Sequence, residues 1–425
     1  MPIQIIIDPL PGADRVAVLN DGRLIAYFED DGAAAAPRPG SIARARVERV
    51  FAENKMIACR LDVAGGSIAA SLRWPGGAMP KPGDRLAVTV AAEAREGKPI
   101  QLRRGVVRED PAMIFESRGR GLRLSRRLAA TGFEAPAALV DLALKLKGEM
   151  SITLRLGAAK LDADTLLARA VGLSEEVKAH AESAAASTSG DGVISTGPDA
   201  ASTAQHIFPA AEVIMDTAGS RWQETDLDSM IEAAISPRHQ LAGGAVLHIN
   251  TPPGAAVIDG DSGNSNLSPS ALAGAMVVPV AEAMLLRRIS GPVVIDFPRL
   301  DRTAMQRIDA AMRDAVADDP LHPVCHGFTP GGLYTLTRPW RWRPLAELLA
   351  PTPQRLGLAA LRLARRAGMG AKTGIVVVPP AAGNWLNGDG AAYRDEVMKG
   401  LASCIEFLSD EGCVQTRFDA QVMKG

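Results

Sequence analysis

The chain has 425 residues, of which 47% are hydrophobic and 22% charged, a composition that excludes a disordered or fibrous protein. This length exceeds what one compact core supports and predicts about two to four domains. Because 47 Lys and Arg stand against 48 Asp and Glu, the net charge of −1 gives no overall electrostatic case for nucleic-acid binding, and only local patches can make one.

The cysteines and the apolar runs bear on the compartment. Cys59, Cys325, Cys404 and Cys413 form no C-x-x-C pair, so neither a disulfide framework nor a thiolate zinc site is expected. The apolar residues 1–8 lack a basic leader and are typical of a strand. No run approaches the roughly 18 to 20 apolar residues that a membrane span requires. We therefore expect a cytoplasmic protein without membrane contact.

The first forty residues predict a β-hairpin. Apolar runs at Ile3–Ile7 and Val16–Leu19 precede the turn Asn20–Gly22, and Leu24–Phe28 forms the returning strand. Residues 30–39, which are rich in alanine, glycine and proline, mark a domain boundary.

Short alternating segments with glycine and proline turns follow from residue 40 to about 108. The predicted strands are 43–50, 56–63, 67–72 and 85–90. Strands at this spacing favour a small β-barrel such as an OB-fold, with another small sandwich as the alternative.

Arg103 to Arg127 is the clearest basic stretch, with eight arginines against three acids. Guanidinium groups match phosphate geometry, so such a cluster can follow a nucleic-acid backbone without reading its sequence. A solvated protein face is the alternative interpretation.

The remaining chain divides into a linker and two α/β regions. Residues 181–204, rich in alanine, serine, threonine and glycine, are expected to form a flexible linker, and Thr225–Ile235 has helical spacing. An α/β pattern begins at residue 244. The expected C-terminal elements are a helix at 356–366, a strand at 373–378 and a final helix at about 393–408.

Two apolar strands end in aspartate. Residues 255–258 lead to Asp259 and residues 291–295 lead to Asp296, with room for a crossover helix at 270–288. Because ligands bind at the carboxyl ends of such strands, we expect both aspartates at one sheet edge.

Two neighbouring carboxylates repel each other unless a cation neutralises them, and hard oxygen ligands suit Mg²⁺. A bound Mg²⁺ would polarise a phosphoryl oxygen and lower the pKa of water for attack on phosphorus. Asp261 offers a third oxygen. The alternative is that each aspartate caps the turn or helix that follows it.

In order along the chain, these segments resemble the catalytic half of the ribonuclease E/G family. Residues 255–263 and 291–297 are similar to the family's metal-site segments, which read approximately I-D-V-N-S-G and V-I-D-F. The resemblance implies that Asp259 and Asp296 bind the metal. Asp261 takes the place of an asparagine that assists them, so the expected catalytic set is Asp259, Asp296 and Asp261.

The resemblance extends beyond this site. Residues 15–24 look like the family's opening hairpin, which belongs to a ribonuclease-H-like fold, and residues 40–62 look like the start of its OB-fold. Residues 124–128 and 154–156 are similar to its sensor for an RNA 5′-monophosphate. Residues 332–338 resemble the end of its deoxyribonuclease-I-like subdomain.

The implied fold is an α/β multidomain protein, with a ribonuclease-H-like and deoxyribonuclease-I-like α/β core, an inserted OB-fold β-barrel and a small C-terminal α/β domain. The expected parts are the ribonuclease-H-like subdomain at 1–39 and 205–243, the OB-fold at 40–110, a reduced sensor region at 111–180, the linker at 181–204, the catalytic subdomain at 244–350 and the small domain at 351–425.

Departures from the family pattern alter the expected RNA contacts. Ala43 and Arg60 replace aromatic residues of the barrel, so stacking of about 1 to 3 kcal/mol per base is lost and binding becomes more electrostatic. Lys98 matches a basic RNA contact, with a solvated turn lysine as the alternative. Arg155 matches a phosphate-holding arginine, but Leu156 replaces the neighbouring threonine, which argues against a preference for 5′-monophosphate ends.

Two further departures concern catalysis and assembly. Residues 325–330 lack two arginines of the family, which is expected to slow hydrolysis. Residues 350–353 replace the cysteines of the family's zinc link, so no zinc is expected, and a monomer or homodimer is expected rather than the family's tetramer. Residues 337–343 interleave arginine with tryptophan, which suits either RNA binding or packing against the protein.

The sequence therefore predicts a Mg²⁺-dependent endoribonuclease acting on single-stranded RNA, with Mn²⁺ as a substitute. The expected RNA-binding residues are Arg60, Lys98, Arg123, Arg126, Arg127, Arg155 and Arg338. A catalytically weak or inactive RNA-binding paralogue is the alternative, and a nuclease acting on DNA or another phosphodiester is a third possibility.

Overall fold

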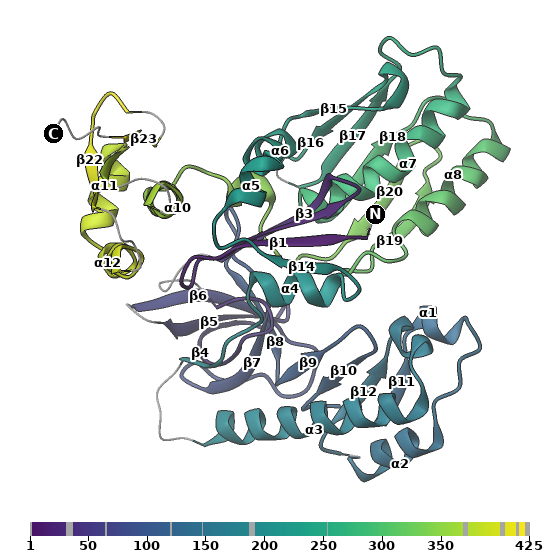
Figure 1. The fold of residues 1–425 in the computed structure, drawn as a ribbon. Helices are drawn as coiled ribbons and strands as arrows, with labels where there is room; N and C mark the ends of the chain where they lie inside the picture. Colours follow the sequence, from purple (N-terminus) through teal and green to yellow (C-terminus); the bar gives the residue numbers. More distant parts are fainter. Residues whose placement is uncertain are drawn as a thin grey trace. The chain divides into compact units, whose positions relative to one another are not determined.

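A computed structural model gives the structure of the chain (Figure 1). It describes residues 2–30, 37–63, 66–119, 121–146, 148–186, 192–252, 254–368, 373–399, 404–413 and 416–420. The chain divides into two compact units. The first contains residues 1–33, 210–339 and 344–425, and the second contains residues 34–209 and 340–343.

The first unit begins with a four-stranded sheet in the order β14-β1-β2-β3. Its strands are β1 (Gln4–Asp8), β2 (Arg15–Asn20), β3 (Arg23–Glu29) and β14 (Glu212–Met215). The predicted hairpin is confirmed, and Asp21 and Gly22 take the positive φ values of 49° and 74° that a tight hairpin turn requires.

Three short helices pack on this sheet around Trp222, which is fully buried. They are α5 (Ser220–Glu224), α6 (Leu227–Ala234) and α9 (Leu345–Leu348). The parallel pairing of β1 with β14 joins the two segments expected to form one subdomain. The ribonuclease-H-like identity of that subdomain stays a prediction.

The first unit also contains a six-stranded sheet in the order β15-β16-β17-β18-β20-β19. Its strands are β15 (Arg238–Gln240), β16 (Val246–Asn250), β17 (Ala256–Asp261), β18 (Gly291–Asp296), β19 (Val324–Phe328) and β20 (Tyr334–Arg338). Helices α7 (Pro269–Leu286) and α8 (Arg302–Ala315) share one hydrophobic core with one face of the sheet (Figure 1). The sheet starts at Arg238, before the boundary expected at residue 244.

Helix α7 is the crossover predicted between the two aspartate strands. It is long and apolar enough to cross a membrane by length and composition, so the expectation that no such run exists was wrong. Met276, Val280 and Met284 of α7 lie in the core beneath the sheet. One side of α7 therefore contributes to the core of this domain.

The C-terminal part of the first unit is a three-stranded sheet with three helices. Its elements are α10 (Pro353–Gly368), β21 (Thr373–Val378), α11 (Pro380–Asn387), α12 (Ala391–Lys399), β22 (Cys404–Ser409) and β23 (Arg417–Ala420). The predicted helix and strand at its start are confirmed. The helix expected through residue 408 was wrong at its end, because Cys404–Ser409 pairs in parallel with β21.

The second unit contains a closed five-stranded barrel. Strands β4 (Ile42–Phe51), β5 (Met56–Val63), β6 (Gly66–Arg73), β8 (Ile100–Arg104) and β7 (Arg85–Ala92) follow one another around it. The pairing of β4 with β7 closes the ring. The OB-like barrel is thus confirmed, and β13 (Gly192–Ser195) pairs with β4 as an added strand.

A smaller sheet in the order β11-β12-β10-β9 lies in the same unit. Its elements are β9 (Val107–Glu109), β10 (Met113–Glu116), β11 (Gly121–Leu124), α1 (Arg126–Ala129), α2 (Ala137–Lys145), β12 (Ser151–Leu154) and α3 (Ala163–Ala185). The linker expected at 181–204 is largely ordered. Residues 181–185 continue α3, β13 follows, and α4 (Ala200–Ile207) begins before residue 204, while residues 187–191 lie outside the described chain.

Candidate active site

Asp259 and Asp296 lie opposite each other on neighbouring strands. Strands β17 and β18 run parallel, and their register pairs Asp259 with Asp296. Ile258 and Ile295 are fully buried in the core with α7 and α8. Because side chains alternate along a strand, both carboxylates face the open side of the sheet, where both residues are exposed.

An aromatic cluster fixes the backbone that follows Asp296. The ring centroid of Phe297 lies 5.9 Å from the ring centroid of Phe328 and 6.0 Å from that of Tyr334. The hydroxyl of Tyr334 donates a hydrogen bond to Asp309 of α8 at 2.9 Å. Packed strands, rather than a free loop, therefore position the Asp296 carboxylate.

Asp261 lies two residues beyond Asp259 and closes a turn. Its Oδ1 accepts a hydrogen bond from the backbone N–H of Gly263 at 2.7 Å. Asp261 is exposed, so its second carboxylate oxygen remains accessible. Asp261 thus caps the turn with one oxygen and leaves its other oxygen accessible on the face of the sheet that carries Asp259 and Asp296.

The donor set suits a Mg²⁺ ion that shares its coordination with water and substrate. Among the described residues, the side chains of Asp259 and Asp296 form no hydrogen bond or ion pair, and no group of three or more His, Cys, Asp or Glu converges into a complete ligand cage. Mg²⁺ is commonly held by one or two carboxylates, with waters and phosphate oxygens completing the octahedron. The pair fits that pattern.

A second pair of aspartates occupies the corresponding place in the other sheet. Asp8 ends β1 and Asp216 follows β14, which runs parallel to β1. Unlike Asp296, Asp8 is fully buried, and Asp216 accepts a hydrogen bond from the backbone N–H of Trp222 at 2.8 Å.

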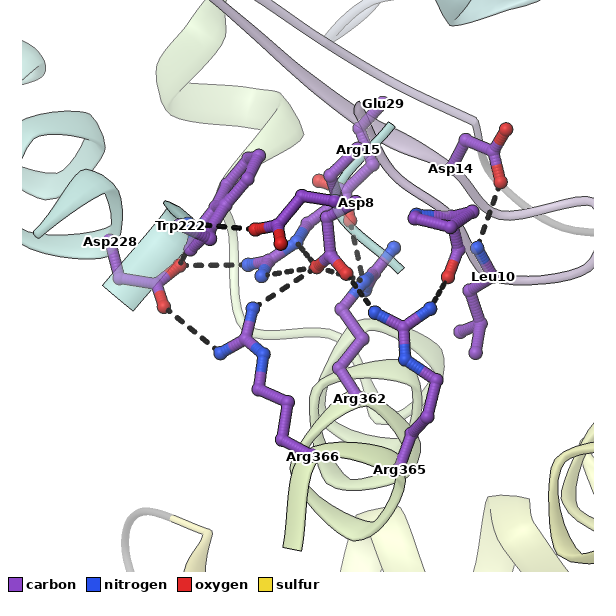
Figure 2. Close-up of polar contacts among 12 residues, drawn as sticks. Asp8, Leu10, Asp14, Arg15, Glu29, Trp222, Asp228, Arg362, Arg365 and Arg366 are labelled. Atoms are coloured by element: carbon purple, nitrogen blue, oxygen red, sulfur yellow. Dashed lines mark hydrogen bonds and ion pairs between the residues drawn. The ribbon is translucent and has the colours of Figure 1, made fainter. Parts of the chain in front are cut away.

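Guanidinium groups surround the carboxylate of Asp8 (Figure 2). Arg15 lies at 2.8 Å, Arg366 at 3.1 Å and Arg362 at 3.6 Å, and Arg365 forms a further ion pair. Burial alone raises the pKa of Asp8, but these arginines outweigh burial and hold the pKa below its ordinary value. Asp8 is thus already neutralised, whereas Asp259 and Asp296 are not.

The OB-like barrel carries the predicted residues Arg60 and Lys98. Arg60 is exposed over 38% of its side chain and pairs with Glu48 at 2.9 Å. Lys98 lies in an exposed turn, where its backbone forms an isolated antiparallel β-bridge with the backbone of Arg95. Both cations are on the surface, as RNA contact requires.

The outer face of the barrel that carries Arg60 also carries further arginines, which the sequence did not predict as RNA contacts. Arg46 lies opposite both Arg60 and Arg85, so three arginines form one row across β5, β4 and β7. The next rows add Arg49 opposite Ala58, then Phe51 and Arg73 on either side of Met56. The outward-facing arginines of β4 are Arg46 and Arg49, which are three residues apart across a β-bulge, so simple alternation along the strand did not signal this face.

Phe51 supplies an aromatic surface on the same face. Its side chain is 40% exposed, and the guanidinium of Arg49 lies 5.0 Å from the ring centroid. An exposed ring beside cations is the combination on which single-stranded bases stack. Ala43, by contrast, is fully buried in the core of the barrel, so position 43 does not lie on this face.

The stretch from Arg103 to Arg127 is not one continuous surface. Arg103 pairs with Glu116 at 2.6 Å, Arg104 stacks on Trp74 at 3.7 Å, and Arg108 donates to the carbonyl of Gly40. Part of the predicted patch therefore stabilises the unit. Arg123 and Arg126 are exposed, Arg127 is half-buried, and Arg120 lies outside the described residues.

Internal partners occupy two other predicted RNA contacts. Glu109 pairs with Arg155 at 3.2 Å and also with Arg341. Burial, chiefly, lowers the pKa of Arg155. Arg338 is 1% exposed and pairs with Asp319 at 2.8 Å, so the expectation that Arg338 contacts RNA is corrected to a structural role.

The arginine–tryptophan segment also packs within its own unit. Arg95 stacks on Trp340 at 3.8 Å, and Trp342 is buried. Together with the ion pair of Arg341, these contacts favour packing over RNA binding for residues 340–343.

Residues 199–341 match the model of the Ribonuclease E/G family. This segment includes β14 and all six strands of the sheet that carries Asp259 and Asp296. A search of curated proteins finds no match to the chain.

Proposed function

Because the chain belongs to the ribonuclease E/G family, a membership that suggests ribonuclease activity, we propose that it is an endoribonuclease that hydrolyses phosphodiester bonds in single-stranded RNA with Mg²⁺. The observation that carries this proposal is the Asp259–Asp296 pair, which is exposed and not neutralised by a protein cation among the described residues.

Asp259 and Asp296 would hold the Mg²⁺, and Mn²⁺ would substitute because it accepts the same oxygen ligands. When bound there, such an ion polarises a phosphoryl oxygen and lowers the pKa of a coordinated water. Asp261 assists through its free carboxylate oxygen. No zinc is part of the proposed chemistry.

The proposed RNA-binding residues lie mainly on the outer face of the barrel. Arg60, Arg46, Arg49 and Arg73 would neutralise phosphates there, since guanidinium groups pair bidentately with phosphate oxygens. Lys98, Arg123, Arg126 and Arg127 extend the set. This electrostatic binding predicts little dependence on RNA sequence.

An RNA-binding protein without cleavage activity is the second candidate. It is favoured by the sequence of β19 and its turn, where exposed His326 bonds to Thr337 at 2.9 Å and no arginine stands nearby in residues 325–330. Missing positive charge near the reacting phosphate would weaken stabilisation of the transition state.

We also propose that the protein is located in the cytoplasm and that it is a monomer or a homodimer.

Cleavage of a fluorescent single-stranded RNA by the purified protein tests the proposal. With Mg²⁺, the protein should cleave the RNA, and both EDTA and Asp296→Asn should reduce the rate by at least about a hundredfold, because one of two metal-binding carboxylates is lost. The matched control is Asp301→Asn, which changes an aspartate that caps α8 outside the site.

Binding of the same RNA is measured in parallel. Binding without cleavage under Mg²⁺ or Mn²⁺ would reject the nuclease and leave the RNA-binding protein. A DNA strand of the same sequence serves as the competing substrate, and equal cleavage of both strands would reject the specificity for RNA.

A further inference from the structure

The sheet of the carboxylate pair carries two basic side chains in the same cross-strand row. Strand β16 pairs His248 with Asp259, and strand β15 pairs Arg238 with His248. Since Asp259 in turn pairs with Asp296, the row across four strands reads Arg238, His248, Asp259, Asp296. Residues directly opposite each other in a sheet point their side chains to the same face.

That face is the open one. Leu247 and Ile249, on either side of His248, are buried in the core with α7 and α8, whereas His248 is half-exposed. Arg238, on the edge strand, is exposed. Within the described chain, neither side chain forms a hydrogen bond or an ion pair, so both are available to a ligand on this face.

The spacing suits a strand of RNA crossing the sheet. Directly opposite Cβ atoms lie about 4.5 to 5.5 Å apart, which puts the imidazole of His248 within reach of a phosphate oxygen beside the Asp259 carboxylate. The four strands of the row span roughly 14 Å at a strand separation of about 4.8 Å. A stacked single strand of about five nucleotides covers that length, at about 3.4 Å per nucleotide step.

The neighbouring rows supply no competing cation. One contains Gln240, Val246 and Asp261, and the other contains Asn250, Val257, Val294 and Thr335. Arg238 and His248 are therefore the basic groups in the same row as the carboxylates. His326 of the same sheet lies on β19, two strands from Asp296, and bonds to Thr337. An imidazole carries an N–H donor in either charge state, and a guanidinium is always charged.

We infer that Arg238 and His248 bind the RNA phosphates next to the scissile bond and align the strand over Asp259 and Asp296. The inference rests on the proposed function and deepens it. Arg238 supplies charge to a phosphate at the edge of the sheet, and His248 donates a hydrogen bond to a phosphate oxygen closer to the reacting phosphorus.

The test compares RNA binding in the full chain carrying Asp296→Asn, so that binding is measured without cleavage. Arg238→Ala should raise the Kd for a fluorescent single-stranded RNA about five- to twentyfold and reduce the slope of log K against log salt by about 0.7, the loss of one phosphate contact. Arg238→Lys should restore the slope. His248→Ala should raise the Kd about two- to fivefold, and His248→Gln, which keeps an N–H donor, should recover most of that loss.

The control is Arg307→Ala, which removes an exposed arginine from α8 on the helix-covered side of the sheet. With Asp296 restored, Arg238→Ala should raise KM and leave kcat within about twofold, because the lost contact binds ground state and transition state alike. Thermal unfolding of every variant checks that the fold is intact.

The outcomes separate this inference from the proposed function. Loss of binding in Arg238→Ala and His248→Ala supports the inference even if the parent protein cleaves nothing. Cleavage by the parent, with Kd and KM of both variants equal to those of the Arg307→Ala control, overturns the inference and leaves the nuclease standing. A chain that does not bind RNA overturns both.

Discussion

Asp8 and Asp296 are both aspartates at the end of a strand that pairs in parallel with its neighbour. Their surroundings differ, and so do the roles that the two carboxylates can have. Asp8 is buried and contacts four arginines, while Asp296 is exposed. A carboxylate that protein cations already neutralise has little to gain from a metal ion. Residue type and strand position alone therefore do not identify a metal ligand.

Asp261 allows a test at a single residue. Asp261→Asn keeps an oxygen for the Gly263 N–H and another group toward the metal site, so the cleavage rate should stay within about threefold. Asp261→Ala removes both functions and should lower the rate about ten- to a hundredfold, as for supporting ligands of other metal sites. Rates are measured at saturating Mg²⁺, and equal rates for the two variants would contradict the assisting role.

The strands of the barrel place side chains from distant positions on one face. Arg46, Arg60 and Arg85 lie side by side across three strands, and Arg60 also pairs with Glu48. The arrangement is a property of the sheet, because it depends on register and not on any local cluster in the sequence.

Two substitutions separate stacking from charge on this face. Phe51→Ala should weaken single-stranded RNA binding by about 1 to 3 kcal/mol with an unchanged salt slope, since a stacked base releases no counterion. Arg73→Ala should instead reduce the slope by about 0.7. Fluorescence titrations over a range of salt measure both effects, and a changed slope in Phe51→Ala would contradict the stacking role.

Across the first unit, the Asp8 cluster joins segments that are far apart in the chain. Asp8 at the end of β1 pairs with Arg362, Arg365 and Arg366 of α10 (Figure 2). Glu29 pairs with Arg355 and Arg362 of the same helix. Burial, and then the nearby Arg15, lower the pKa of Arg362 to about 10. Because this value is still well above neutral pH, the Arg362 guanidinium stays charged. The network fixes α10 against the N-terminal sheet.

Removal of the central carboxylate should destabilise the protein strongly. Asp8→Asn removes the buried carboxylate that the guanidinium groups of Arg15 and Arg362 share, which costs about 3 to 5 kcal/mol in the free energy of unfolding. The control Asp228→Asn changes a half-exposed carboxylate that also pairs with Arg15, and should cost at most about 1 kcal/mol. Urea unfolding measures both losses, and equal losses would contradict the role of burial.

The same network predicts a pH dependence of stability. The pKa values of Asp8 and Glu29 are lowered in the folded protein, because the arginines outweigh the effect of burial. Their contribution to the free energy of unfolding is therefore full above the ordinary carboxyl pKa of about 4 and is lost as the pH falls through the lowered values. Unfolding titrations between pH 7 and about 2 should show this decline, and Asp8→Asn should flatten it.

The sequence by itself determined the elements whose patterns are local. The hairpin at residues 15–29, the barrel strands and the two apolar strands ending in Asp259 and Asp296 all follow from alternation and turn residues over a few positions. It missed β8 and misassigned Cys404–Ser409 as helix, because a short apolar run takes its conformation from the strand beside it.

Only the tertiary structure decided which charged side chains are available. Arg338 and Asp8 carry ordinary surface residue types but lie buried, and they pair with residues far away in the chain, Asp319 for Arg338 and the arginines of α10 for Asp8. Arg155 is held by Glu109. The rows Arg46–Arg60–Arg85 and Arg238–His248–Asp259–Asp296 exist only through strand register. Burial and register are long-range properties of packing, so a local pattern of residues does not encode them.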